Sequence, residues 1–244
     1  MPDGRDGRAE EMAWWGLVSA TAAPVLLIGG WTIAASRQPG AFDQVRDTVS
    51  ALAGLGATDR WLMTTALAAV GTCHLATATA LRPAPRAGRL LLGLGGMATI
   101  GVAAFPLPLE GGSTAHTICA AVAFGSLAVW PAMPSQDGTA QAGRPRSSGQ
   151  GRPTRSWRAR QPTPVRRPVR LAAAGVLVGL VGWLLAELVG DGSRVGLAER
   201  VAAGAQAIWP LATAIGLSME RLPARGSDRS SDGRRSGPGV NGPC

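Results

Sequence analysis

The chain of 244 residues contains no lysine and no tyrosine, and all 24 of its basic residues are arginine. Without lysine the chain cannot form a Schiff base, hold retinal through a lysine or supply the lysine of a phosphate-binding loop. Cysteine is also scarce, because the only three are Cys73, Cys119 and Cys244. They form no Cys-x-x-Cys pair and cannot build a disulfide framework.

Charge is missing from long parts of the chain, although the formal net charge is +9. Uncharged stretches of 16 to 26 residues recur, and such stretches are typical of membrane-spanning helices rather than of a soluble enzyme. We therefore predict an all-α protein, a polytopic membrane helix bundle with six transmembrane helices. The expected spans are residues 12–36, 61–81, 90–109, 113–133, 169–190 and 201–219.

Two segments differ in composition from the spans. Residues 134–168 are rich in Arg, Pro, Ser and Gly and have almost no aliphatic side chains, so we expect a disordered linker. Residues 220–244 are a second segment of this kind. The predicted organisation is a short segment 1–12, four helices within 13–133, the linker, two helices within 169–219, and the tail.

The arginines indicate the orientation of the bundle. With both termini in the cytoplasm, 19 of the 24 arginines lie on the inner side and five on the outer side. Because arginine near span ends is concentrated on the cytoplasmic face, we expect a multi-pass plasma-membrane protein with cytoplasmic termini. Arginine richness without lysine is typical of a GC-rich genome and suggests a bacterium. We expect the basic linker to contact anionic lipids of the inner leaflet rather than nucleic acid.

Polar residues in or beside the outer ends of the spans are the candidates for function, because membrane-embedded polar groups are costly. Asp47, Ser50 and His116 have the residue types of an acid, a nucleophile and a base, or of a site that holds a metal-bound water. Aspartate and serine are also common helix caps, and a histidine at a helix end can bond to a neighbouring loop, so structural roles stay open.

Glu187, Glu199 and Arg200 are the second candidate group. They could line a pocket that binds a ligand such as a lipid headgroup. We favour the alternative that they form a structural ion pair that fixes the fifth span against the sixth, since intramembrane charges usually pair inside the bundle.

A zinc site made of Cys73, His74, His116 and Cys119 is excluded by depth. His74 lies roughly 20 Å along its span from the outer end and His116 within about 5 Å, at a rise of ~1.5 Å per residue. We expect no metal and no cofactor, and we interpret His74 as a residue that bonds between helices.

The run Arg46-Asp47-Thr48-Val49-Ser50-Ala51-Leu52, followed by Asp59-Arg60-Trp61, resembles a segment of the membrane proteins grouped as domain of unknown function 998. The resemblance covers residues 13 to 220 without the linker, and Pro106, His116, Trp130-Pro131, Glu199-Arg200 and Trp209-Pro210 are similar to its actinobacterial branch. Many relatives have Ile-Ser-Asp-Leu-Gly where this chain has Val-Ser-Ala-Leu-Ala at 49–53, so an acid after the serine is missing. The resemblance implies a six-helix membrane architecture but no reaction.

Three functions stay open at the level of the sequence. The first is binding or transport of a lipid or small amphiphile through an outward-facing polar pocket. The second is a membrane-embedded hydrolase that uses the Asp/Ser/His group or a metal-bound water, and the third is a structural scaffold with unknown protein partners.

Overall fold

The computed structural model describes residues 14–40, 42–133 and 167–219. These residues contain seven α-helices, one 3-10 helix and no strand. The elements are α1 (Trp14–Ser36), α2 (Val49–Leu52), α3 (Trp61–Ala80), α4 (Arg86–Ala104), α5 (Thr114–Val129), η1 (Trp130–Ala132), α6 (Arg167–Val189) and α7 (Val195–Met219). Six of them are long and apolar enough to cross a bilayer, which confirms the all-α fold class and a multi-pass membrane protein.

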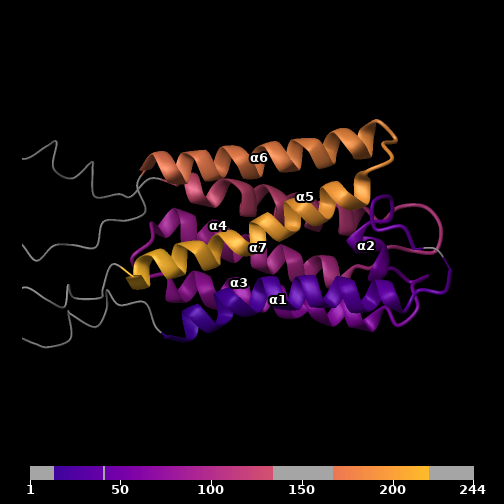
Figure 1. The fold of residues 1–244 in the computed structure, drawn as a ribbon, viewed down its shortest axis with the longest axis horizontal. Helices are drawn as coiled ribbons and strands as arrows, with labels where there is room; N and C mark the ends of the chain where they lie inside the picture. The colour runs from indigo at the N-terminus through magenta and orange to yellow at the C-terminus, as the bar shows by residue number, and fades with distance from the viewer. Residues whose placement is uncertain (1–13, 41, 134–166, 220–244) are drawn as a thin grey trace, which may run out of the picture.

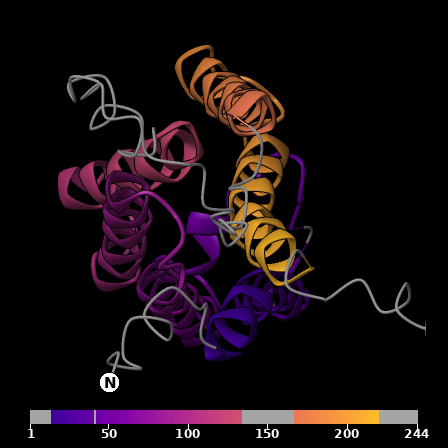
Figure 2. The same ribbon diagram turned by 90° about the vertical axis from the view of Figure 1, so that its left-hand side faces the viewer.

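The six long helices run side by side along the longest axis of the molecule (Figure 1). α1 begins and α7 ends at one end, called the terminal end here, and α2 lies at the opposite end, called the loop end. Viewed from the terminal end, the helices surround a central region in the order α1, α3, α4, α5, α7 (Figure 2). α6 lies outside this ring against α5 and α7.

Proline and polar contacts shift several span boundaries from those expected. The third span ends at Ala104 rather than at residue 109, because Pro106 and Pro108 cannot continue a helix. It begins at Arg86 rather than at residue 90. Within this added first turn, the Arg89 side chain donates hydrogen bonds to the carbonyls of Ala78 and Thr79 in α3. The fifth span begins at Arg167, two residues before the expected start.

The sixth span begins at Val195 rather than at residue 201. The sequence-based boundary placed Glu199 and Arg200 just before the start of the span. Both side chains are instead 7% exposed and lie inside the bundle, within the helix. The predicted segment 1–12, the tail 220–244 and all but the last two residues of the predicted linker 134–168 lie outside the described residues.

Two glycines allow α3 and α4 to approach closely, as small residues do between membrane spans. A Cβ at Gly71 would lie 2.5 Å from the Gly96 carbonyl oxygen, and a Cβ at Gly96 would lie 2.7 Å from that of Gly71. The Gly175 and Gly179 face of α6 has no atom within 4 Å of a Cβ at either position. Gly71 and Gly96 are therefore packing residues, whereas a Cβ at Gly175 or Gly179 would meet open space in the described chain.

Replacing Gly71 with alanine should destabilise the bundle. The added methyl group would overlap backbone atoms, which cannot move as a side chain can, so we expect the free energy of unfolding to fall by about 1–3 kcal/mol. Thermal unfolding in detergent measures the effect, and Gly175→Ala is the matched control that should not lower the midpoint, because alanine is the better helix former where a Cβ meets open space. Equal midpoints for the two variants would contradict the close crossing.

Candidate functional site

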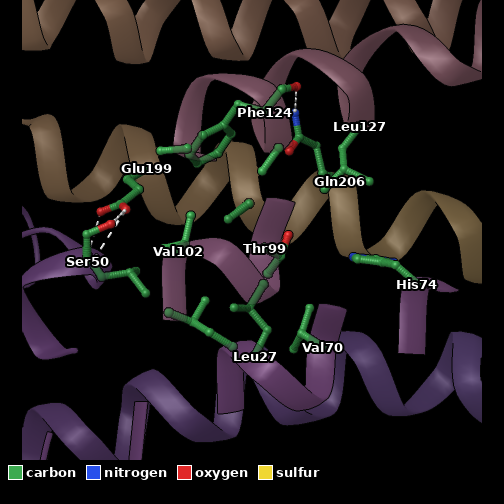
Figure 3. A pocket seen from close by; sticks show the side chains of 15 residues that line it. Leu27, Ser50, Val70, His74, Thr99, Val102, Phe124, Leu127, Glu199 and Gln206 are labelled. Atoms are coloured by element: carbon green, nitrogen blue, oxygen red, sulfur yellow. Dashed lines mark hydrogen bonds between the residues drawn. The ribbon is translucent and has the colours of Figure 1, made fainter. Parts of the chain in front are cut away.

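A cavity of about 60 Å³ lies inside the ring of helices. Its wall is mostly apolar, with side chains from α1, α3, α4, α5 and α7 and with α2 at the loop end (Figure 3). A water needs about 10–15 Å³ of such space, so the cavity has room for a few waters. The polar residues of the wall are Ser50, His74, Thr99, Glu199 and Gln206.

Glu199 provides the charge at one end of the cavity. Its carboxylate accepts hydrogen bonds from the Val49 amide at 2.5 Å, the Ser50 amide at 3.3 Å and the Ser50 hydroxyl at 2.8 Å (Figure 3). The amides belong to the first turn of α2, where backbone N–H groups have no partner within the helix. Glu199 of α7 thus provides the acceptor for amides at the start of α2, although Val49 and Glu199 lie 150 residues apart in sequence. The same bonds hold the buried carboxylate in place.

Two of the remaining polar groups of the wall, Gln206 and Thr99, keep an oxygen free to accept a hydrogen bond. The Gln206 side-chain amide donates to the Phe124 carbonyl at 2.9 Å, which leaves its oxygen as an acceptor. The Thr99 hydroxyl donates to the Gly95 carbonyl at 2.8 Å, so its proton is also used within the protein. Together with the Glu199 carboxylate, these groups favour a guest that donates hydrogen bonds.

His74 lies at the other end of the cavity from Glu199 (Figure 3). Its side chain is 2% exposed, and its Nδ1 has no hydrogen-bond partner within the described residues. The interpretation of His74 as a residue that bonds between helices was therefore wrong for this atom. An unpartnered buried polar atom is rare in native proteins and points to a missing partner at this site.

Arg200, the next residue after Glu199, does not pair with it. Its Nη1 donates to the carbonyls of Gln44, Asp47 and Gly196 at 2.7, 2.7 and 3.0 Å, and its guanidinium lies 5.6 Å from the centre of the Phe42 ring. In the described residues neither Glu187 nor Glu199 forms an ion pair with Arg200, so the structure shows no such pair fixing the fifth span against the sixth. Arg200 fastens the loop between α1 and α2 to α7, and Glu199 alone reaches the cavity.

The other candidate residues lie around the loop end without bonding to one another. Asp47 accepts from the Asp43 amide at 2.8 Å, and His116 Nδ1 lies 2.9 Å from the Phe105 carbonyl oxygen. Glu187 accepts from the Trp183 indole and the Arg194 amide at the turn between α6 and α7. Among the predicted catalytic and ligand-binding residues, the structure joins Ser50 to Glu199 through their side chains and Arg200 to the backbone carbonyl of Asp47.

Sequence reasoning missed three members of the site. His74 was considered for a metal and as a residue that bonds between helices, but not as part of a cavity, and Thr99 and Gln206 were not considered at all. Gln206 could have been found as a lone amide in an otherwise apolar stretch, where a polar side chain is a signal of packing or function. In the described part of the chain, no three His, Cys, Asp or Glu side chains gather as metal ligands.

Removing the Glu199 carboxylate should release α2. Glu199→Ala leaves the Val49 and Ser50 amides buried without acceptors, so we expect a loss of about 2–3 kcal/mol in local stability. Hydrogen–deuterium exchange of residues 48–53 should become at least about tenfold faster. Glu110→Ala, an exposed acid at the same end of the bundle, should leave that exchange unchanged, and slow exchange in both variants would show that the carboxylate does not hold α2.

Comparison with known proteins identifies a family but no activity. The model of the family described as "Protein of unknown function (DUF998)" matches residues 21–216. No curated protein and no solved structure matches the chain.

Proposed function

The chain belongs to the DUF998 family, whose description names no activity, and we propose that this integral membrane protein binds or transports a small amphiphile. The guest places a polar, hydrogen-bond-donating end in the cavity and an apolar part among the helices. The observation that carries the proposal is the buried Glu199 carboxylate in an otherwise apolar wall.

Several features support an amine or ammonium group as the polar end. A buried carboxylate favours a cation, because an isolated charge in an apolar interior is costly. The Phe124 ring lies in the same wall, and aromatic faces attract cations. Arg200, the nearest positive group in sequence, is turned away toward the loop and does not oppose a cationic guest.

The way into the cavity follows from the packing of the helices. Among neighbouring helices around the cavity, α5 and α7 share the smallest contact, and α6 covers the seam between them. α6 itself buries few side chains, namely Ala174, Leu177 and Leu184. The cavity in this structure has room only for waters, so a larger guest needs a movement of the helices. We propose that α6 moves and that the guest enters through the seam between α5 and α7.

Two probes of equal chain length test the polarity of the site. Dodecylammonium should stabilise the protein in nanodiscs against heat by binding the folded state, whereas dodecanoate should not. Glu199→Gln removes the charge but keeps an acceptor for α2, so we expect dodecylammonium to bind at least about tenfold more weakly to this variant.

Filling the cavity provides the control for location. Ala203 lines the cavity, and Ala203→Leu should abolish stabilisation by dodecylammonium. Ala212 is exposed on the same helix, and Ala212→Leu should behave as the original protein. Equal stabilisation by both probes, or an unchanged effect in Ala203→Leu, would reject the proposal.

We also propose that the bundle lies in a bacterial plasma membrane with the terminal end in the cytoplasm. The excess of arginine in the segments at that end supports this orientation. On this orientation the cavity's charged end lies toward the outer face, and the arginines of residues 134–168 are available to anionic lipids of the inner leaflet.

Cysteine labelling tests the orientation. In a chain with Cys73, Cys119 and Cys244 replaced by serine, Asp191→Cys lies in the turn between α6 and α7 and should react with a membrane-impermeant maleimide on intact cells. Arg82→Cys, exposed in the turn between α3 and α4, should react only after permeabilisation. The reverse pattern would place the terminal end outside.

A further inference from the structure

A groove separate from the cavity runs along the outer surface of α3 and α4, in the half of the bundle near the terminal end. It has a volume of about 610 Å³ and shares no lining residue with the cavity. The groove is lined by Leu75, Ala78, Thr79, Arg86, Arg89, Leu90, Gly93, Leu94 and Met97. From Arg86 to Met97 it extends about 16 Å along α4 at a rise of ~1.5 Å per residue.

The two ends of the groove differ in chemistry. Leu90, Leu94 and Met97 line it with side chains that are 75%, 47% and 55% exposed, so they meet the hydrocarbon of a bilayer. Arg86 and Arg89 stand at the other end, one turn apart on the same face of α4. The groove is therefore apolar along its length and cationic where α4 begins.

The positive charge at this end has no counter-charge in the described part of the chain. Arg82 adds a third guanidinium in the adjoining turn, and no ion pair to a carboxylate is formed by any of the three. Arg89 donates from Nε to the Ala78 carbonyl at 2.8 Å, which orders its guanidinium at the edge of the groove. Arg86 is exposed, and its guanidinium donates no hydrogen bond to the residues that the structure describes.

We propose that this groove binds one anionic phospholipid. The phosphate lies between Arg86 and Arg89, since guanidinium groups bind phosphate through paired hydrogen bonds. One acyl chain lies along Leu90, Leu94 and Met97. Gly93 forms part of the groove wall, where an added Cβ would meet only the side chains of Ala78 and Leu75, at 3.8 and 3.9 Å.

Charge and shape together select this occupant. A soluble anion would satisfy the arginines but leave the apolar length of the groove unused. A zwitterionic phospholipid would fill the groove but bring its own cation to the arginines. An anionic phospholipid satisfies both ends, and its site is independent of the cavity and of the guest proposed for it.

Native mass spectrometry of the full chain, released from nanodiscs of equal parts phosphatidylglycerol and phosphatidylcholine with identical acyl chains, tests the site. We expect one phosphatidylglycerol to be retained in preference to phosphatidylcholine. Arg86→Gln should reduce that preference about fivefold, the factor that corresponds to about 1 kcal/mol for one arginine near a lipid surface. Gly93→Leu should reduce retention of the lipid by filling the groove.

Matched variants separate the groove from general effects. Arg167 is exposed at the start of α6 at the same end of the bundle, and Arg167→Gln should leave the preference unchanged. Gly179 has nothing within 4 Å of a Cβ, and Gly179→Leu should leave retention unchanged. Equal retention of the two lipids, an equal loss in Arg167→Gln, or displacement of the lipid by inorganic phosphate alone would overturn the proposal.

Discussion

The hydrogen bonds between Glu199 and the first turn of α2 are the interaction on which the loop end of the bundle depends. α2 is only four residues long and could not persist by its own hydrogen bonds. The carboxylate accepts both of its leading amides and the Ser50 hydroxyl, so α2 stays folded between the long helices. The same bonds stabilise a charge that burial alone would disfavour, and α2 in turn closes one end of the cavity.

Glu199 and Arg200 are adjacent in sequence but have different partners and different structural roles. A direct pair would have neutralised both and left the cavity without a carboxylate. Because Arg200 instead binds the backbone carbonyls of Gln44 and Asp47, it holds the loop between α1 and α2 in place while Glu199 remains in the cavity wall. One turn of α7 thus has two separate effects: Arg200 fixes the loop, and Glu199 places a carboxylate in the cavity wall.

Much of the fold could be predicted, because spans are recognised by their length and lack of charge. The boundaries near Glu199 and Arg200 could not, since hydropathy treats every charged residue as solvated. Among the site residues, Ser50 and Glu199 were predicted separately, but their hydrogen bond joins positions 149 residues apart. His74 and Gln206 were missed because their importance depends on the cavity that they line.

The sequence by itself determined that the chain has six stretches long and apolar enough to cross a membrane and that its arginines are concentrated in the segments between and beside them. These properties follow from composition along the chain, because the hydropathy and charge of each segment decide whether it enters the bilayer. Only the tertiary structure decided that Glu199 reaches the cavity, that Arg200 does not, and that the second and third spans form a groove with arginines at one end. Which face of a helix meets which neighbour depends on close packing between distant segments, such as the crossing of α3 and α4 at Gly71 and Gly96, and no local pattern specifies it.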